Sequence, residues 1–396
     1  MKIRPATIVI AAALAACAPR AGAEVSVTIT NTQDAPRHQI VEIDAPQALA
    51  MGGETRAVNA LGQDIPYQIA HDGKILVEVA VRPLGEAKIT LKPGTPAQFK
   101  SYCHGRQFPE RLDDLAWEND RCAYRCYGPA LQRTGERAFG IDVWLKSTPE
   151  PVVEARYQME TGNGPLIEEA KKRSPEAADS LYRLISYHYD HGDGLDCYKV
   201  GPSLGCGAPA LMRGDTLLFP RCYDSYKILD NGPLRFTVEL TFPPTDDGIV
   251  EHRLISLDKG SNFNKITVWY DGLTRPAALA AGVVIHTEDT LSVALGENYV
   301  HYADPTDNPA GQNSQIYVAA VFPHGVTSTR TLAEGHPESG VAGHAVGIVD
   351  GYTGQKYTYY AGAAWSKYDC RSQSEWQLRV EALLSAIAAP LLVTAE

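Results

Sequence analysis

The segment RFTVELTF, residues 235–242, indicates the fold most clearly, because its apolar side chains fall on every second position. Phe236, Val238, Leu240 and Phe242 would share one face, which is the pattern of a β-strand with one buried side. Similar short segments follow at close intervals, separated by Gly, Asp, Asn or Pro: HRLISL, KITVWYDG, AGVVIHT, NYVHYA and QIYVAAVF. Many strands without helices between them predict antiparallel sheets packed face to face.

The whole chain is therefore predicted to be mostly β. Residues 24–100 contain short strands and an Asp72-Gly73 hairpin signal, which predict a small N-terminal β-sandwich. Residues 101–396 hold too many strands for an immunoglobulin-size sandwich and predict a large antiparallel β-supersandwich. Within it, 161–185 favours two helices separated at Pro175. Ser372 to Glu375 forms a capping box before a C-terminal amphipathic helix that we expect to dock on the sandwich.

Residues 1–23 are typical of an export signal. Lys2 and Arg4 precede an apolar run that is too short to span a membrane. Two processing sites compete: a lipobox that ends at Cys17, and a small-residue site with cleavage after Ala23. We favour the lipobox, because the apolar run ends directly at Cys17. The expected location is the periplasm or the outer membrane, with contact to the membrane only through a lipid on Cys17.

Charge and cysteine content limit the function further. The net charge of −11 and the absence of a basic run argue against a nucleic-acid partner. Seven cysteines follow the signal, so an oxidising compartment would leave at least one unpaired. Cys122 and Cys126, four apart on a predicted strand, lie roughly 13 Å apart, which is too far for a mutual disulfide. No CxxC pair supports a zinc site among the cysteines.

The richest stretch for chemistry is YHYDHGDGLDCYKVGPSLGCG, residues 187–207. Its glycines predict an irregular loop that brings imidazole, carboxylate and phenol groups together. We expect His188 and His191 to be the proton-transfer pair, because an imidazole works as acid or base near pH 7. The orienting and reserve catalytic groups are Asp190, Asp193 and Tyr189. The alternative is a divalent metal held by His188, His191 and Asp193, although their spacing matches no diagnostic ligand pattern.

Several other side chains are candidates for holding a substrate. Guanidinium groups pair bidentately with carboxylates, so arginines in a cleft suit uronic acids, and Arg125 or Arg213 is the expected carboxylate clamp. Aromatic side chains stack on sugar faces, although each is more often part of a core. The predicted substrate-binding set is Trp117, Asn119, Arg121, Arg125, Tyr198, Lys199, Arg213 and Arg221.

Other candidates receive a structural interpretation. His252, His286, His301 and His344 lie on strand-like segments and are expected to be structural histidines. The glycine-rich GPSLGCGAP segment lacks the lysine and the strand–helix setting of a P-loop, which excludes a nucleotide site of that kind.

Three segments resemble an exported bacterial family of unknown function: AWENDRCAYRCYGPAL (116–131), FGIDVWLK (139–146) and YHYDHGDGLDCYKVGPSLGCGAPAL (187–211). The resemblance extends from about residue 24 to 376. That family is encoded beside pectin- and uronate-degrading enzymes, including unsaturated uronyl hydrolases. The resemblance implies a carbohydrate-utilisation setting and a supersandwich similar to galactose-mutarotase-like and polysaccharide-lyase folds. It implies no catalytic residues.

Together these observations predict an enzyme that acts on oligosaccharides containing uronic acid, by β-elimination or by glycoside hydrolysis. Elimination needs a base, a cation against the carboxylate and an acid at the leaving oxygen. Hydrolysis needs two carboxylates, for which Glu118, Asp120, Asp193 and Asp196 are available. The alternatives are a lipid-anchored glycan-binding protein and a mutarotase-like sugar epimerase. No cofactor is expected, apart from the divalent metal considered above.

Overall fold

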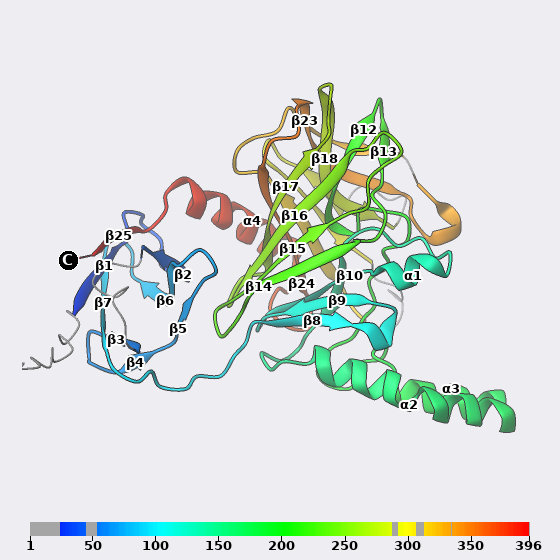
Figure 1. The fold of residues 1–396 in the computed structure, drawn as a ribbon, viewed down its shortest axis with the longest axis horizontal. Helices are drawn as coiled ribbons and strands as arrows, with labels where there is room; N and C mark the ends of the chain where they lie inside the picture. The colour runs from blue at the N-terminus through cyan, green and yellow to red at the C-terminus, as the bar shows by residue number, and fades with distance from the viewer. Residues whose placement is uncertain (1–23, 45–53, 287–291, 306–312, 334, 396) are drawn as a thin grey trace, which may run out of the picture.

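The computed structural model describes residues 24–44, 54–286, 292–305, 313–333 and 335–395, so the predicted export signal lies outside the described residues. The architecture is mostly β, as predicted, with a small N-terminal domain beside a large sandwich (Figure 1). All the pairings between its named strands are antiparallel.

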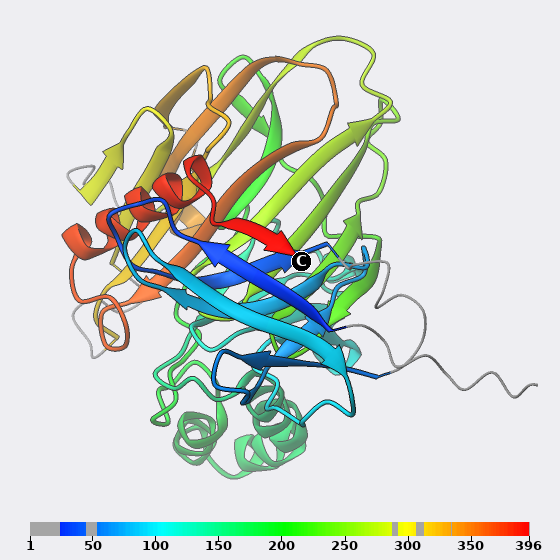
Figure 2. The same ribbon diagram turned by 90° about the vertical axis from the view of Figure 1, so that its left-hand side faces the viewer.

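The N-terminal domain is a small sandwich of a five-stranded sheet, order β25-β1-β7-β3-β4, and a three-stranded sheet, order β2-β6-β5. The predicted hairpin at Asp72-Gly73 is present between β5 and β6. The last strand of the chain, β25, pairs with β1 and completes the first sheet (Figure 2). The strands are β1 (Val25–Thr30), β2 (Arg37–Ile43), β3 (Thr55–Asn59), β4 (Asp64–Ile65), β5 (Tyr67–Ile69), β6 (Ile75–Val81), β7 (Glu86–Pro93) and β25 (Leu392–Ala395).

The large domain packs an eight-stranded sheet against a five-stranded sheet. Val238 and Leu240 are fully buried between them, which confirms the alternation read from the sequence. The eight-stranded sheet runs β14 (Ser225–Asn231), β15 (Arg235–Thr241), β16 (Val250–Asp258), β17 (Phe263–Asp271), β24 (Tyr357–Trp365), β21 (Ile316–Val321), β20 (Tyr299–Asp304) and β19 (Val293–Leu295). The five-stranded sheet runs β13 (Thr216–Leu218), β12 (Cys206–Arg213), β18 (Ala277–Ile285), β23 (Gly343–Tyr352) and β22 (Ser328–Leu332).

A four-stranded sheet forms the foot of the large domain. One of its faces packs into the sandwich core through Trp117 and Tyr124, and the other packs against Tyr157 of α2. Figure 1 shows α2 and α3 below this sheet. The strands, in sheet order, are β11 (Asp142–Leu145), β10 (Cys122–Cys126), β9 (Asp114–Glu118) and β8 (His104–Phe108), and short helices η1 (Pro109–Arg111), α1 (Pro129–Arg133) and η3 (Pro337–Ser339) lie in connections of the large domain.

The longer helices follow local sequence signals. α2 (Val153–Arg173) and α3 (Pro175–Ile185) are separated at Ser174, whose hydroxyl caps α3, so the predicted break before Pro175 is present. α2 begins eight residues before the predicted region and contains Pro165. α4 (Gln373–Ala388) begins at the predicted capping box, where the Ser372 hydroxyl accepts a hydrogen bond from the Glu375 amide.

Two further features bear on the sequence predictions. All seven cysteines in the described part of the chain are buried, and no disulfide joins any two of them. Among the described residues, no helix is both long enough and apolar enough to span a membrane.

Candidate functional site

The loop that follows α3 is held along the edge of the four-stranded sheet. Leu195 exchanges both backbone hydrogen bonds with Leu145 of β11, at 2.9 and 3.1 Å. Asp196 bridges to Trp144, and Gly205 to Ile141. The predicted chemical stretch is therefore anchored by backbone pairing, and one of its buried side chains, Asp196, contacts Arg125 of the sheet.

Arg125 is the centre of a buried charged cluster on this sheet. Its guanidinium group contacts Asp142, the Asp196 carboxylate at 2.9 Å and the Asp114 carboxylate at 3.5 Å. All four side chains are at most 5% exposed. The guanidinium group also lies over the Trp144 ring, 5.0 Å from its centroid. Arg125 is predicted to bind a substrate carboxylate, but three carboxylates of the protein already surround its guanidinium group, which is not exposed.

The cluster has more carboxylates than cations, and one of them should stay protonated near neutrality. Burial raises the pKa of Asp142 to about 7, although the charge of Arg125 opposes this shift. Burial also raises the pKa of Asp114. Two carboxylates close together disfavour a second negative charge, which strengthens the effect of burial. We therefore expect the cluster to exchange a proton near pH 7.

Asp142→Asn should flatten the pH dependence of stability. The folded-state pKa of Asp142 lies above its unfolded value, so its contribution is fully present below about pH 4 and is lost as pH rises through about 7. Over that interval the wild type should lose up to about 1.4 kcal/mol of unfolding free energy per pH unit from this group, and the variant should not. Urea denaturation at pH 5 and pH 8 measures both slopes. Asp246→Asn, on an exposed turn, is the control, and equal slopes for wild type and Asp142→Asn would contradict the assignment.

The predicted histidine pair lies in the first part of the loop, and each ring contacts the loop backbone. His188 Nδ1 lies 3.0 Å from the Asp196 carbonyl oxygen, and its side chain is 44% exposed. His191 Nε2 lies 2.9 Å from the Ser186 carbonyl oxygen. Their role as a proton-transfer pair stays a prediction.

The acidic partners predicted for these histidines have other contacts. Asp190 accepts hydrogen bonds from the amides of Gly192 and Gly194, and Asp193 pairs with Arg156 at 3.3 Å. The Tyr189 ring packs edge-on against Tyr182. Across the described residues, no group of three His, Cys, Asp or Glu side chains is arranged to hold a metal ion.

The remaining predicted substrate-binding residues are dispersed. Trp117 is buried and donates to the Asn264 side chain at 2.8 Å. Asn119 is buried and donates to the backbone of the β16–β17 turn. Arg213 and Arg221 are exposed, and Arg121 ion-pairs with Asp369 at 3.4 Å. Only Tyr198 and Lys199 lie beside another candidate reactive group, described next.

The carboxylates proposed for hydrolysis are also occupied. Glu118 is buried, pairs with Lys146 at 2.6 Å and accepts the Val152 and Val153 amides at the start of α2. Asp120 accepts the Gly260 amide. These contacts favour structural roles for both carboxylates.

His286 and Asp304 form a buried pair where the two large sheets meet. His286 follows β18 of one sheet, and Asp304 ends β20 of the other. Nδ1 of the imidazole lies 2.6 Å from a carboxylate oxygen, and the side chains are 9% and 1% exposed. The Tyr198 ring meets the imidazole edge-on, with centroids 5.5 Å apart. Within the described part of the chain, His286 Nε2 and the Tyr198 hydroxyl have no hydrogen-bond partner.

The electrostatics of this pair suit proton transfer. Burial and, to a lesser degree, the charge of Lys199 lower the pKa of His286, but the charge and hydrogen bond of Asp304, with a contribution from the Lys199 backbone, outweigh them, so the pKa is raised overall. Burial raises the pKa of Tyr198 strongly, and the charges of Cys206, Asp304 and Asp142 add to this, so its phenol stays protonated. Asp304 fixes the imidazole through Nδ1 and leaves Nε2 as the nitrogen that can take or give a proton.

Sequence reasoning assigned His286 a structural role, and no local motif distinguishes it. Its partner lies on a strand of the other sheet, so only the packed sandwich reveals the pair. Two other His–Asp pairs differ in exposure: the His71 side chain is 35% exposed beside Asp230, and Asp271 is 71% exposed beside His252. Of these three pairs, only His286–Asp304 has both side chains at least nine-tenths buried.

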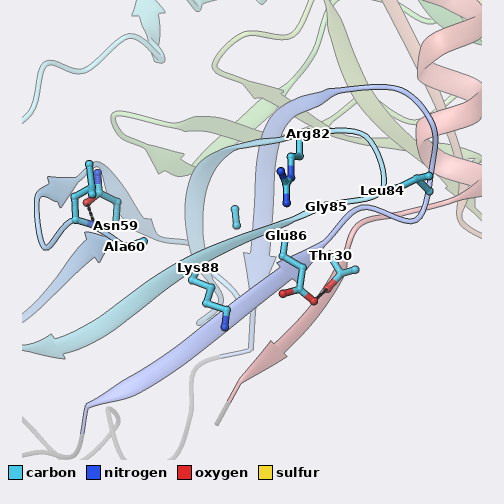
Figure 3. Close-up of a pocket in the computed structure, with 10 residues that line it drawn as sticks. Thr30, Asn59, Ala60, Arg82, Leu84, Gly85, Glu86 and Lys88 are labelled. Atoms are coloured by element: carbon cyan, nitrogen blue, oxygen red, sulfur yellow. Dashed lines mark hydrogen bonds between the residues drawn. The ribbon is translucent and has the colours of Figure 1, made fainter.

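An open depression on the N-terminal domain is a weaker candidate for a catalytic site than the His286 site. It has a volume of about 730 Å³. Figure 3 shows Thr30 and Glu86 joined by a hydrogen bond there, with Lys88 and Arg82 nearby. Its lining contains no histidine or tyrosine, so it lacks the imidazole and the phenol of the His286 site.

Comparisons with known proteins give a family, one sequence relative and two solved structures of low similarity. The model of a family described as "Domain of unknown function (DUF4861)" matches residues 29–393. "Uncharacterized protein P7" of Formosa agariphila is 26% identical over 415 residues, covering 98% of this chain and 97% of that protein.

Two solved structures from Enterococcus faecalis align with 94% of this chain. One is an alpha-mannosidase, with 9% identity and a TM-score of 0.47, and the other is a protein in glycosyl hydrolase family 38, with 8% identity and a TM-score of 0.48. The chain spans about half the length of these structures, 46% and 47%.

Proposed function

We propose that this chain, which belongs to the family described as "Domain of unknown function (DUF4861)", is a carbohydrate-active enzyme that acts on oligosaccharides containing uronic acid. The observation that carries the proposal is the buried His286–Asp304 pair, with an unpartnered Nε2 beside the unpartnered Tyr198 hydroxyl among the described residues. The sequence resemblance to a family encoded beside uronate-degrading enzymes supports the substrate class.

The chemistry that suits these groups best is β-elimination. His286 Nε2 would remove the C5 proton of the uronate, whose acidity the neighbouring carboxylate increases when a cation faces it. The C5–H electron pair forms the C4–C5 double bond, and the C4–O bond breaks with its pair on the leaving oxygen. The protonated Tyr198 hydroxyl would then supply a proton to that oxygen. Lys199, whose charge acts on His286, contributes a cation on this side of the ring.

Glycoside hydrolysis receives less support from the geometry. It needs two carboxyl groups that face one sugar, roughly 5–10 Å apart. Asp114, Asp142 and Asp196 are close to one another but are buried around Arg125. Glu118 is buried against Lys146. The described carboxylates therefore favour structural over hydrolytic roles.

A panel of saturated and unsaturated uronate oligosaccharides tests the function. A lyase creates a conjugated double bond that absorbs in the ultraviolet, and mass spectrometry identifies the product. Loss of an existing double bond would instead show hydrolysis of an unsaturated uronyl group. Inversion of the configuration at a sugar carbon without cleavage would indicate an epimerase. Binding of an oligosaccharide that is recovered unaltered would indicate a glycan-binding protein. We expect a chelator to leave the activity intact, and loss on chelation with recovery on metal addition would favour the metal alternative.

We also propose that the protein is exported and anchored through Cys17. Cys17→Ser should move the protein from the membrane fraction to the soluble periplasmic fraction, because the residue that carries the lipid is lost. Cell fractionation followed by immunoblotting measures this. An unchanged membrane-bound fraction would contradict the lipid anchor.

A further inference from the structure

A cleft of about 720 Å³ lies between the N-terminal domain, the outer face of the eight-stranded sheet and α4. Figure 2 shows α4 and the N-terminal strands side by side over this sheet. Its volume is within the range of small-molecule sites, roughly 300–1,000 Å³. Among its lining residues are the cations Arg37, Arg121, Arg235, Lys259, Lys265 and Arg379, and the carboxylates Glu42 and Asp258.

Three of these cations are neutralised by close partners. Arg235 contacts Glu42 at 2.7 Å and also pairs with Asp258. Lys259 pairs with Glu78 at 2.7 Å. The third, Arg379, pairs with Asp369 and Glu375, each at 2.8 Å. These contacts tie the walls of the cleft together and leave little of the charge for a ligand.

The other three cations are less closely paired with carboxylates. Arg37 donates to the Gln39 side chain and to the carbonyls of Ala386 and Ala389, so most of its guanidinium N–H groups are already used. Lys265 is exposed on β17 and has no ion-pair partner among the described residues. Arg121 is 37% exposed, and its only ion pair in the described part is the 3.4 Å contact with Asp369, which also binds Arg379 more closely. A chain of net charge −11 thus presents two available cations, Lys265 and Arg121, in one cleft.

The rest of the lining suits a saccharide. Ser256 and Tyr360 lie opposite Lys265 on the two neighbouring strands, so hydroxyl groups flank the ammonium group across the sheet. α4 contributes Ala382 and Leu383 to the other wall. A sugar ring offers hydroxyl groups on its edge and an apolar C–H face, and so matches both walls.

We propose that this cleft is a second, non-catalytic site that binds an acidic oligosaccharide through carboxylate or sulfate groups repeated along its chain. Tyr360 points to the outer side of the sheet, where it packs with α4, whereas Tyr359 and Tyr302 lie in the core between the sheets. Tyr302 is two residues from Asp304 on the same strand face. The sheet thus separates the cleft from the His286 site, and the cleft holds the glycan without acting on it.

The test is isothermal titration calorimetry of the full chain with a short oligogalacturonate. His286→Asn is used as the background so that no probe is consumed. Arg121→Gln/Lys265→Gln should weaken binding by about tenfold, because it removes the two exposed charge contacts to the anionic groups. Arg173→Gln, which removes an exposed cation outside the cleft lining, should leave the affinity unchanged. The fully methyl-esterified oligomer keeps the sugar and loses the charge, and should bind at least tenfold more weakly.

Oligosaccharides with different anionic groups show which group the cleft recognises. Equal binding of a sulfated neutral-backbone oligosaccharide would identify repeated anions as the recognised feature, and preference for galacturonate would identify the uronate. Unchanged affinity in Arg121→Gln/Lys265→Gln, equal affinity for the methyl ester, or tighter binding of a single-stranded oligonucleotide would each overturn the proposal. Lys265→Gln alone, at a residue outside the predicted substrate-binding set, should keep the wild-type kcat, so the cleft can be tested independently of turnover at His286.

Discussion

His286→Asn is expected to lower kcat on a uronate oligosaccharide by about 10²–10⁴-fold, the usual cost of removing a proton-transfer group. Asparagine can still pair with Asp304 but cannot accept a proton as imidazole does. Since the side chain would act in the transition state and not in holding the sugar, KM should change little. Initial rates from ultraviolet absorbance, measured beside the thermal midpoint, separate lost chemistry from lost folding.

The pH profile supplies a second signature of His286. As a general base it must be unprotonated, and Asp304 raises its pKa above the ordinary 6.5. The rate should therefore rise with pH through a value above 6.5 in the wild type, and this limb should disappear in His286→Asn. His71→Asn is the matched control, because His71 also faces an aspartate, Asp230, but lies in the N-terminal domain with a side chain 35% exposed. Near-normal turnover in His286→Asn with loss in His188→Ala would return the role to the loop histidines.

Arg125→Leu is expected to lower the unfolding free energy by about 3–5 kcal/mol at pH 8, because it leaves buried carboxylates without their cation. The guanidinium group contacts Asp114, Asp142 and Asp196, and all three are at most 3% exposed. Urea denaturation gives the change directly.

Arg125→Leu should lower the unfolding free energy less at pH 5 than at pH 8. At pH 5 more of the cluster is protonated, because burial raises the pKa of Asp114 and Asp142, so fewer negative charges need the cation. Arg213→Leu is the control, since Arg213 is exposed, and it should cost less than about 1 kcal/mol at either pH. A loss of that small size for Arg125→Leu, or an equal loss at pH 5 and pH 8, would contradict the description of the cluster.

The parts of the fold that follow from short-range signals could be predicted from the sequence. Alternation in 235–242 gave a strand, and Phe236 is fully buried as that pattern requires. The capping box before α4 and the break at Pro175 were also visible, because capping and proline effects act within one helical turn. The pairing of β25 with β1 joins segments about 365 residues apart, and no local pattern specifies it.

The candidate site was predictable only in part. The stretch 187–207 supplies one residue to each of the two clusters described above, since Tyr198 lies against His286 and Asp196 against Arg125. Spacing alone favoured His188 and His191, because it cannot show that each ring contacts a backbone carbonyl of its own loop. It also cannot show which arginine is already surrounded by carboxylates, since those partners come from β9, β11 and the loop.

The most direct measurement of the central claim is product formation from the oligosaccharide panel by wild type and His286→Asn under identical conditions. We predict that the wild type forms an unsaturated uronate product, detected by ultraviolet absorbance and by mass, and that His286→Asn forms it at least about 100-fold more slowly while it is still folded at the assay temperature, as its thermal midpoint shows. A folded His286→Asn that produces the same product at the wild-type rate would contradict the claim.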